Sequence, residues 1–333
     1  MATLKDIANA LKVSPSLVSK VLNDKMGTSG ANEKLIAEIK DTALRLGYQK
    51  NLSAAMLQSG RHGSIGVLLH LPGNAGSGIV DQVVSALTKG SSEHKVKLQI
   101  RFYEGDAQFE TLAKEFNRST CDGLLVVGIA EPHAAKVLLD RVREKLPLVT
   151  VFSKSVAKGI LNIDLDYGSI SAVLANHLHA IGCRSILCNS SLSVMHQEVS
   201  KHLKKLGVQL QYKSFADLPL DFSYESGRIW TEAVLAAGFE FDGLFMACDD
   251  QAAAAIVALQ KAGKNVPQDV AVVGVDQAPW GAFFPCPISS IHQKFYQRVE
   301  LGVASLMDLI QGKDVQVLNI APELRIRESS RRI

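Results

Sequence analysis

Two short amphipathic segments within the first 23 residues, joined by a tight turn, most constrain what this chain can fold into. The first follows Thr3, whose side chain can cap a helix. Its apolar residues recur at the spacing of one buried helical face: Leu4, Ile7, Ala8 and Leu11. Ser14 can cap a second helix, and Pro15 follows at the first helical position, where its missing N–H costs nothing. The pattern predicts two helices that pack together.

The second of these helices has two chemically different faces. Its apolar stripe consists of Leu17, Val18, Val21 and Leu22. The residues left outward are Pro15, Ser16, Ser19, Lys20 and Asn23. A small, hydroxylic and basic face on a helix that packs against a partner suits insertion into the DNA major groove. We interpret the pair as a helix-turn-helix, the alternative being a helical hairpin that binds nothing.

The rest of the amino-terminal region is basic and predicts one further helix. Asn32 can cap a helix that runs to Gly47. Residues 1–62 hold nine Lys or Arg against five Asp or Glu, a net charge of +4, whereas the 333-residue chain as a whole carries +3. A small basic domain at one end of a nearly neutral chain indicates contact with nucleic acid at that end.

From residue 64 onward, strand-like and helix-like segments alternate. The expected strands are 65–69, 96–100, 123–127 and 148–152, and then 185–188, 243–247 and 270–274. Such alternation is typical of parallel sheets with helices on both faces, and its restart predicts two doubly wound subdomains. We expect the chain to cross between them near residues 151–153. Ligands of such sheets bind beyond the carboxyl ends of the strands, here in the cleft between the halves.

Several classes of function are not indicated. The five cysteines (Cys121, Cys183, Cys188, Cys248 and Cys286) show no paired C-x-x-C spacing, so reduced thiols in the core are expected. His177 and His179 lie two apart, which does not place them on one helical face. Neither a nucleophile elbow nor a P-loop occurs, and neither a signal peptide nor a transmembrane run is found. We therefore expect a cytoplasmic protein without catalytic residues, bound metal, cofactor or membrane partner.

Motifs along the whole chain resemble one known family. Residues 3–8 read T-L-K-D-I-A and residues 18–23 read V-S-K-V-L-N; residues 164–168, 174–178, 266–276 and 322–329 supply further landmarks. Together these resemble the lactose/galactose repressor (LacI/GalR) family of bacterial regulators over essentially all 333 residues. The resemblance implies a small all-α helix-turn-helix headpiece (1–48), a hinge helix and linker (49–62), and an effector-binding and dimerisation domain (63–333). The last is expected to have the α/β periplasmic-binding-protein-like (type I) fold, with two doubly wound subdomains.

For DNA, the resemblance implies a homodimer on a pseudo-palindromic operator. The expected contacts are Thr3, Pro15, Ser16, Leu17, Ser19, Lys20, Asn23 and Leu57. Leu57 lies in the hinge, where a leucine of the family wedges between base pairs in the minor groove; the alternative for this segment is a plain linker. The turn departs from the family pattern, because Lys12 stands where Gly or Asn is common, at some cost in turn geometry.

For the small-molecule effector, the resemblance implies contacts from Phe222, Asp249 and Asp276. Carboxylates and an aromatic face suit a sugar, a nucleobase or a related metabolite; the alternatives are a helix-capping Asp and a core Phe. Met195 stands near the expected position of a ligand-clamping arginine, and Ile79 and Val80 near an aromatic edge, so an ordinary free hexose is not expected. The implied function is a transcriptional regulator, a repressor, controlled by a small molecule. The alternatives are a binding module of the same fold without DNA regulation, an enzyme built on it, and a regulator that has lost its ligand response.

Overall fold

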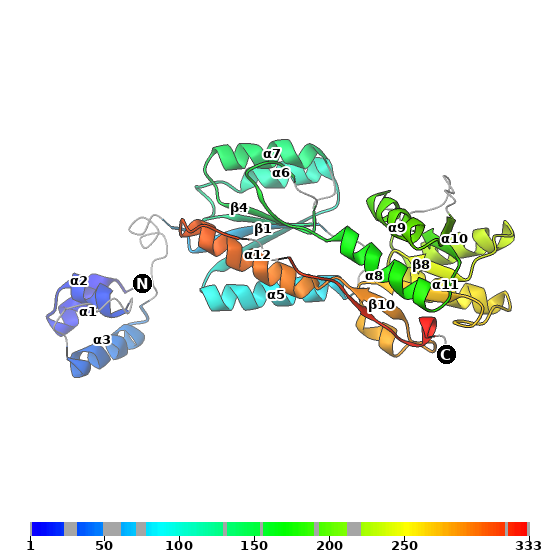
Figure 1. Ribbon diagram of the computed structural model, residues 1–333. Coiled ribbons are helices and arrows are strands. Elements are labelled where there is room, and N and C mark those ends of the chain that lie inside the picture. Colours follow the sequence, from blue (N-terminus) through cyan, green and yellow to red (C-terminus); the bar gives the residue numbers. More distant parts are fainter. Residues whose placement is uncertain are drawn as a thin grey trace. The chain divides into compact units, whose positions relative to one another are not determined.

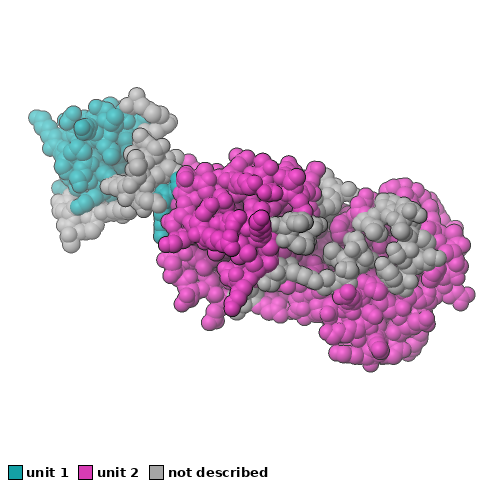
Figure 2. Space-filling model, turned by 90° about the horizontal axis from the view of Figure 1, so that it is seen from above, with its two compact units in different colours: residues 1–62 teal, residues 63–333 magenta. Residues whose placement is uncertain are grey.

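The computed structural model describes residues 2–22, 32–48, 61–70, 78–128, 132–153, 156–189, 193–211, 221–316 and 319–331. The chain divides into two compact units, Met1–His62 and Gly63–Ile333, shown in different colours in Figure 2. None of the helices in these described ranges combines the length and the hydropathy needed to cross a membrane.

The described residues of unit 1 form three helices that share one small core. They are α1 (Leu4–Leu11), α2 (Pro15–Leu22) and α3 (Glu33–Arg45). The buried residues of this core are Ile7, Ala8, Val18, Val21, Ile39 and Ala43. They include members of both apolar stripes predicted from the sequence, so the expectation of helices packed through these faces is confirmed.

All three helices begin at the predicted capping residue. The Asp6 backbone N–H donates to the Thr3 hydroxyl at 3.3 Å, and the Thr3 N–H donates back to the Asp6 carboxylate at 2.8 Å, which completes a capping box. Leu17 N–H donates to the Ser14 hydroxyl at 3.2 Å, and Leu35 N–H to the Asn32 side-chain oxygen at 2.9 Å. These local bonds fix where each helix starts.

The first half of unit 2 is built on a five-stranded parallel sheet in the order β2-β1-β3-β4-β5. The strands are β1 (Ser64–His70), β2 (Lys97–Tyr103), β3 (Leu124–Val127), β4 (Leu148–Val151) and β5 (Leu161–Ile163). The helices of this half are α5 (Ile79–His94), α6 (Asp106–Glu115), α7 (Pro132–Arg143) and, from much later in the chain, α12 (Phe295–Ile310). Helices α5 and α12 cover one face, and α6 and α7 the other (Figure 1).

The second half of unit 2 is built on a six-stranded sheet in the order β11-β10-β9-β8-β6-β7. Its strands are β6 (Ser185–Asn189), β7 (Gln209–Gln211), β8 (Gly243–Met246), β9 (Ala271–Val275), β10 (Ser289–His292) and β11 (Glu323–Arg325), of which only β11 is antiparallel to its neighbour. The helices are α8 (Tyr167–Ala180), α9 (Ser193–Lys205), α10 (Tyr224–Ala236) and α11 (Asp249–Lys261), with short 3₁₀ helices η1 (Pro279–Ala282) and η2 (Glu328–Ser330). The two predicted doubly wound subdomains are confirmed.

Three segments connect the halves, and the predicted crossing near residues 151–153 is wrong. After β4 the chain returns to the same sheet, because β5 pairs with β4 in parallel. The first connection is 164–166, between β5 and α8. The second is 293–294, between β10 and α12, and the third is 311–322, between α12 and β11. The described parts of these connections run between the halves in Figure 1.

Candidate functional site

The exposed face of α2 carries three of the residues predicted to meet DNA. Pro15, Ser16 and Lys20 are exposed, whereas Val18 and Val21 on the opposite side are buried in the headpiece core. Ser16 and Lys20 lie four positions apart and so share one helical face. The Ser14 cap and Pro15 at the first helical position set where this face begins. The arrangement presents a hydroxyl and a cation together on a short, capped helix.

The other predicted DNA contacts are placed differently. Ser19 and Leu17 are half-buried, and Leu17 packs with part of its side chain against the headpiece core. Thr3 is exposed at the start of α1, where its hydroxyl also donates to Asp6 at 2.8 Å. Asn23 and Leu57, with most of the predicted hinge (49–60), lie outside the described residues.

The turn between α1 and α2 contains a strained residue. Lys12 has φ 51° and ψ 43°, the left-handed conformation, and its N–H bonds to the carbonyl of Asn9 at 3.3 Å. A side chain in this region costs free energy that glycine avoids. The backbone of Lys12 therefore shows the expected free-energy cost in the turn. Lysine in place of Gly or Asn also adds a cation beside α2.

The predicted effector residue Asp249 is the first residue of α11, immediately beyond the end of β8. Its side chain is only 1% exposed. One carboxylate oxygen, Oδ2, accepts the backbone N–H of Ala278 at 2.7 Å. The other, Oδ1, lies against β9, since a Cβ built on Gly274 would come within 2.3 Å of it. Asp249 thus holds the turn after β9, and glycine at 274 leaves room for its carboxylate.

Asp276 occupies that turn and is 7% exposed. It has φ 94° and the next residue, Gln277, has φ 54°, so two successive non-glycine residues adopt left-handed conformations. Such strain persists only where surrounding bonds enforce it. Gln293 donates its side-chain amide to Asp276 Oδ1 at 2.7 Å, and Gln277 N–H donates to the Ser290 hydroxyl at 2.9 Å. The turn therefore fixes Asp276 at the end of β9.

Both carboxyl groups are electrostatically unusual. Burial raises the pKa of Asp276 to about 7, against the stabilising effect of the Gln293 bond on the charged form. Burial also raises the pKa of Asp249 well above its ordinary value, and the nearby charge of Asp276 adds to this. Near neutral pH, Asp276 can therefore act as a hydrogen-bond donor as well as an acceptor.

Phe222 lies in a segment tied to the same strand ends. Its carbonyl accepts from the Cys248 thiol at 3.1 Å, and Gln251 on α11 donates its amide to the carbonyl of Asp221 at 2.7 Å. The structure therefore brings Phe222 next to the start of α11, where Asp249 sits. Gln251 was not singled out from the sequence, although an amide two residues after a predicted contact was a usable signal.

The structure also describes the three residues that depart from the family pattern in the sequence, Met195, Ile79 and Val80. Met195 on α9 is buried in the core of the second half, where its sulfur accepts the Ser171 hydroxyl at 3.4 Å. Ile79 and Val80 begin α5 and are half-buried. Apolar groups, rather than a cationic or aromatic wall, occupy these positions.

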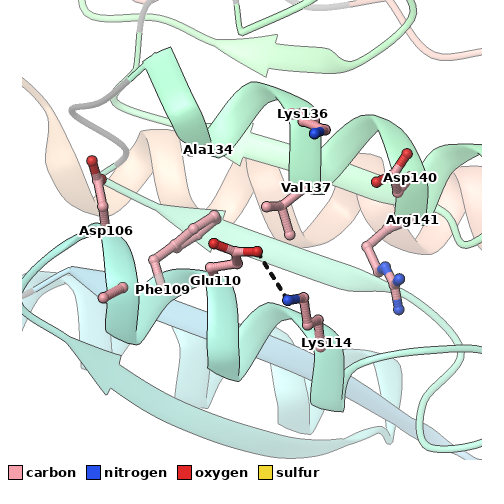
Figure 3. A pocket seen from close by; sticks show the side chains of 10 residues that line it. Asp106, Phe109, Glu110, Lys114, Ala134, Lys136, Val137, Asp140 and Arg141 are labelled. Atoms are coloured by element: carbon pink, nitrogen blue, oxygen red, sulfur yellow. Dashed lines mark hydrogen bonds and ion pairs between the residues drawn. The ribbon is translucent and has the colours of Figure 1, made fainter.

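A separate hollow of about 490 Å³ lies between α6 and α7 in the first half (Figure 3). Phe109 lines it together with charged residues of both signs, and Lys114 pairs with Glu110 across one helical turn at 2.9 Å. Of the predicted DNA- and effector-binding residues that the structure describes, none lines this hollow. Among the parts of the chain that are described, no three His, Cys, Asp or Glu side chains are grouped to hold a metal ion.

Comparison with known proteins finds relatives along the whole chain. A family model of the periplasmic binding protein-like domain matches residues 175–330. The ribose operon repressor of Halalkalibacterium halodurans is 25% identical over 99% of this chain and 98% of its own length. The transcriptional repressor PurR of Serratia proteamaculans is 26% identical over 99% of this chain and 97% of its own length.

Solved structures show the same architecture. A lac repressor dimer bound to operator and the anti-inducer ONPF superposes with a TM-score of 0.79 at 21% identity, over 99% of each chain. A complex of the transcriptional regulator CelR with cellobiose gives a TM-score of 0.68 at 21% identity, over 99% of this chain and 100% of that one. With the headpiece, the two-sheet unit and these full-length relatives, the chain is similar over nearly its whole length to repressors of the lactose/galactose repressor (LacI/GalR) family of bacterial transcriptional regulators.

Proposed function

We propose that this protein is a sequence-specific DNA-binding repressor that binds a pseudo-palindromic operator as a homodimer and is modulated by a small molecule at the strand ends of unit 2. The observation that carries the DNA-binding part is the exposed face of α2, with Ser16 and Lys20 on one side of a capped helix. Relatives that match over nearly the full length are named as repressors, which supports repression as the direction of control.

In this proposal, Lys20 and Ser16 read base edges and Pro15 makes apolar contact beside them. A lysine that reaches guanine O6 and N7 discriminates among base pairs, whereas one that reaches a phosphate does not. Thr3, Leu17, Ser19 and Asn23 are proposed to complete the contacts of each headpiece, and Leu57 to enter the minor groove at the operator centre. Two headpieces on two half-sites supply contacts that one domain of this size lacks.

The test begins with selection of binding sites from a randomised duplex library by the full-length protein. We expect a pseudo-palindromic consensus. Fluorescence anisotropy on that consensus then compares Lys20→Ala with Lys40→Ala, which removes another exposed cation, on α3. Lys20→Ala is expected to cost about 1–3 kcal/mol and to relax preference at one position per half-site. Equal weakening on all sequences, with only the salt slope changed, would make Lys20 a phosphate contact. Failure to select any sequence would favour a ligand-binding module without DNA regulation.

The effector is proposed to bind near Asp276, Phe222 and Gln293. Asp276 supplies a carboxyl whose pKa of about 7 allows it to be protonated or ionised near neutral pH. Gln293 supplies a side-chain amide that already donates to this carboxyl at 2.7 Å. Because apolar Met195, Ile79 and Val80 stand where a cationic clamp and an aromatic edge were expected, the ligand is proposed to be other than a free hexose.

Operator affinity with and without each member of a panel of sugars, nucleobases and nucleosides tests this assignment. The active compound is expected to change operator affinity by about tenfold, a coupling of about 1.4 kcal/mol, and Asp276→Ala is expected to abolish the change. Glu240→Ala, which removes an exposed carboxylate of the same half, is the control. A comparable response to glucose or galactose would refute the exclusion of hexoses. A response that survives Asp276→Ala would refute the site.

A further inference from the structure

Arg298, in the second turn of α12, is a buried cation in the region where the two halves of unit 2 are connected. It is 1% exposed, among the largest fully buried side chains of the described residues. Helix α12 itself packs on the sheet of the first half, where Val299, Val303 and Leu306 belong to the apolar core. The neighbouring position 298 therefore places a guanidinium at the edge of this core.

The guanidinium donates to one backbone carbonyl from each of the three connections. Nε donates to the carbonyl of Gln293 at 2.8 Å, in the second connection. Nη1 donates to the carbonyl of Asp164 at 2.5 Å, in the first, and Nη2 donates to the carbonyl of Ile320, in the third. A planar guanidinium with a rigid set of donors fixes the separation and direction of all its acceptors at once.

Two further bonds extend this network. The Asn319 side chain of the third connection donates to the Asp166 carboxylate of the first at 3.2 Å, and Asp166 also caps α8. Gln293 is bonded to Arg298 through its carbonyl and to Asp276 through its side chain. Arg298 is therefore separated by a single residue from a carboxyl of the proposed effector site.

We propose that Arg298 is a positioning residue that makes the three connections move as one unit and so transmits a change at Asp276 to the relative orientation of the halves. This inference rests on the proposed function, because it assigns the coupling element for the same site. A buried guanidinium that loses an acceptor leaves a charged donor unsatisfied in a water-poor region, which is costly. Independent bending of one connection is therefore disfavoured, and arrangements that keep all three bonds are selected.

The test measures the distribution of distances between the halves directly. Spin labels are attached through Lys136→Cys on α7 and Lys261→Cys on α11, both exposed positions, in the full-length protein. The five native cysteines are buried, so the two new thiols react selectively. Pulsed electron resonance is recorded on the otherwise unmodified protein, on Arg298→Met, and on the control Arg327→Met. Arg327 Nη1 donates to the carbonyl of Ile288 at 2.7 Å, a bond within the second half between residues that belong to none of the connections.

We expect a narrow distance distribution in the parent and in Arg327→Met, and loss of the narrow peak in Arg298→Met. An unchanged narrow peak in Arg298→Met, or equal broadening in both variants, would overturn the proposal. Should Arg298→Met fail to fold, Arg298→Lys and Asn319→Ala replace it: each keeps part of the network and is expected to broaden the peak, and a narrow peak in both would overturn the proposal. The measurement uses neither DNA nor effector, so its failure is distinct from failure of the proposed function.

Discussion

The substitution Asp276→Asn is expected to stabilise the second half of unit 2 at neutral and alkaline pH. The carboxyl is 7% exposed and burial raises its pKa from an ordinary 3.8 to about 7. This difference corresponds to about 4 kcal/mol by which the fold disfavours the ionised form. Asparagine keeps an oxygen that can accept from Gln293 and tolerates the positive φ at this position. The variant therefore removes the charge while preserving the turn.

The sign of the pH dependence follows from proton binding. Between pH 4 and pH 7 the unfolded chain has an ionised Asp276, whereas the folded chain still holds the proton. The folded state binds more protons in this range, so the contribution of this carboxyl to stability is fully present below about pH 4 and is lost as the pH rises from there through about 7. Asp249, whose pKa is also raised by burial, acts in the same direction. Asp276→Asn should flatten this dependence.

Tryptophan fluorescence provides the assay. Both tryptophans, Trp230 and Trp280, lie in the second half of unit 2, so urea unfolding at several pH values reports on the relevant sheet. Glu240→Gln, which neutralises an exposed carboxylate of the same half, should keep the parent pH dependence. Stability of the parent that does not change between pH 5 and pH 8, or an equally steep dependence in Asp276→Asn, would refute the reasoning.

Three further outcomes are expected. Lys12→Gly should stabilise the headpiece by about 1 kcal/mol because φ at Lys12 is 51°, seen as slower amide exchange in α1; an equal gain from Lys12→Ala would contradict this. Ser330→Ala, which removes the 2.7 Å bond between the Ser330 hydroxyl and His177 Nε2, should speed amide hydrogen exchange in residues 323–330. Because burial lowers the pKa of His177, acidification below its ordinary value of 6.5 should loosen the same segment, and unchanged protection at pH 5 would contradict this. Phe283→Asp should weaken self-association in sedimentation equilibrium because Phe283 is 89% exposed; an unchanged dimer would place the interface elsewhere.

The sequence by itself determined the elements whose causes are local. Thr3, Ser14 and Asn32 each accept a hydrogen bond from the backbone N–H three residues later, so a few neighbouring residues determine where each helix starts. Six of the seven predicted strands are mostly apolar and buried, because strands inside a parallel sheet are covered on both faces. The seventh, β2, is a partly exposed strand at the edge of its sheet. The exposed face of α2 followed from helical periodicity alone.

Tertiary structure alone decided the features that depend on distant partners. Four strands were not predicted. Three of them, β5, β7 and β11, are three residues long, only partly buried and at sheet edges. The fourth, β10, lies inside its sheet and is buried, but it reads S-S-I-H, so no apolar run marks any of the four. The pairing of β5 with β4 keeps the chain in the first half past residues 151–153 and places the first connection at 164–166. Helix α12 lies on the first sheet although it follows β10 of the second, which creates the other two connections. Asp249 bonds the backbone 29 residues away, and Arg298 bonds carbonyls as far as 134 residues away. Periodicity and capping report only on neighbours in the chain, whereas these side chains acquire their partners when the sheets assemble.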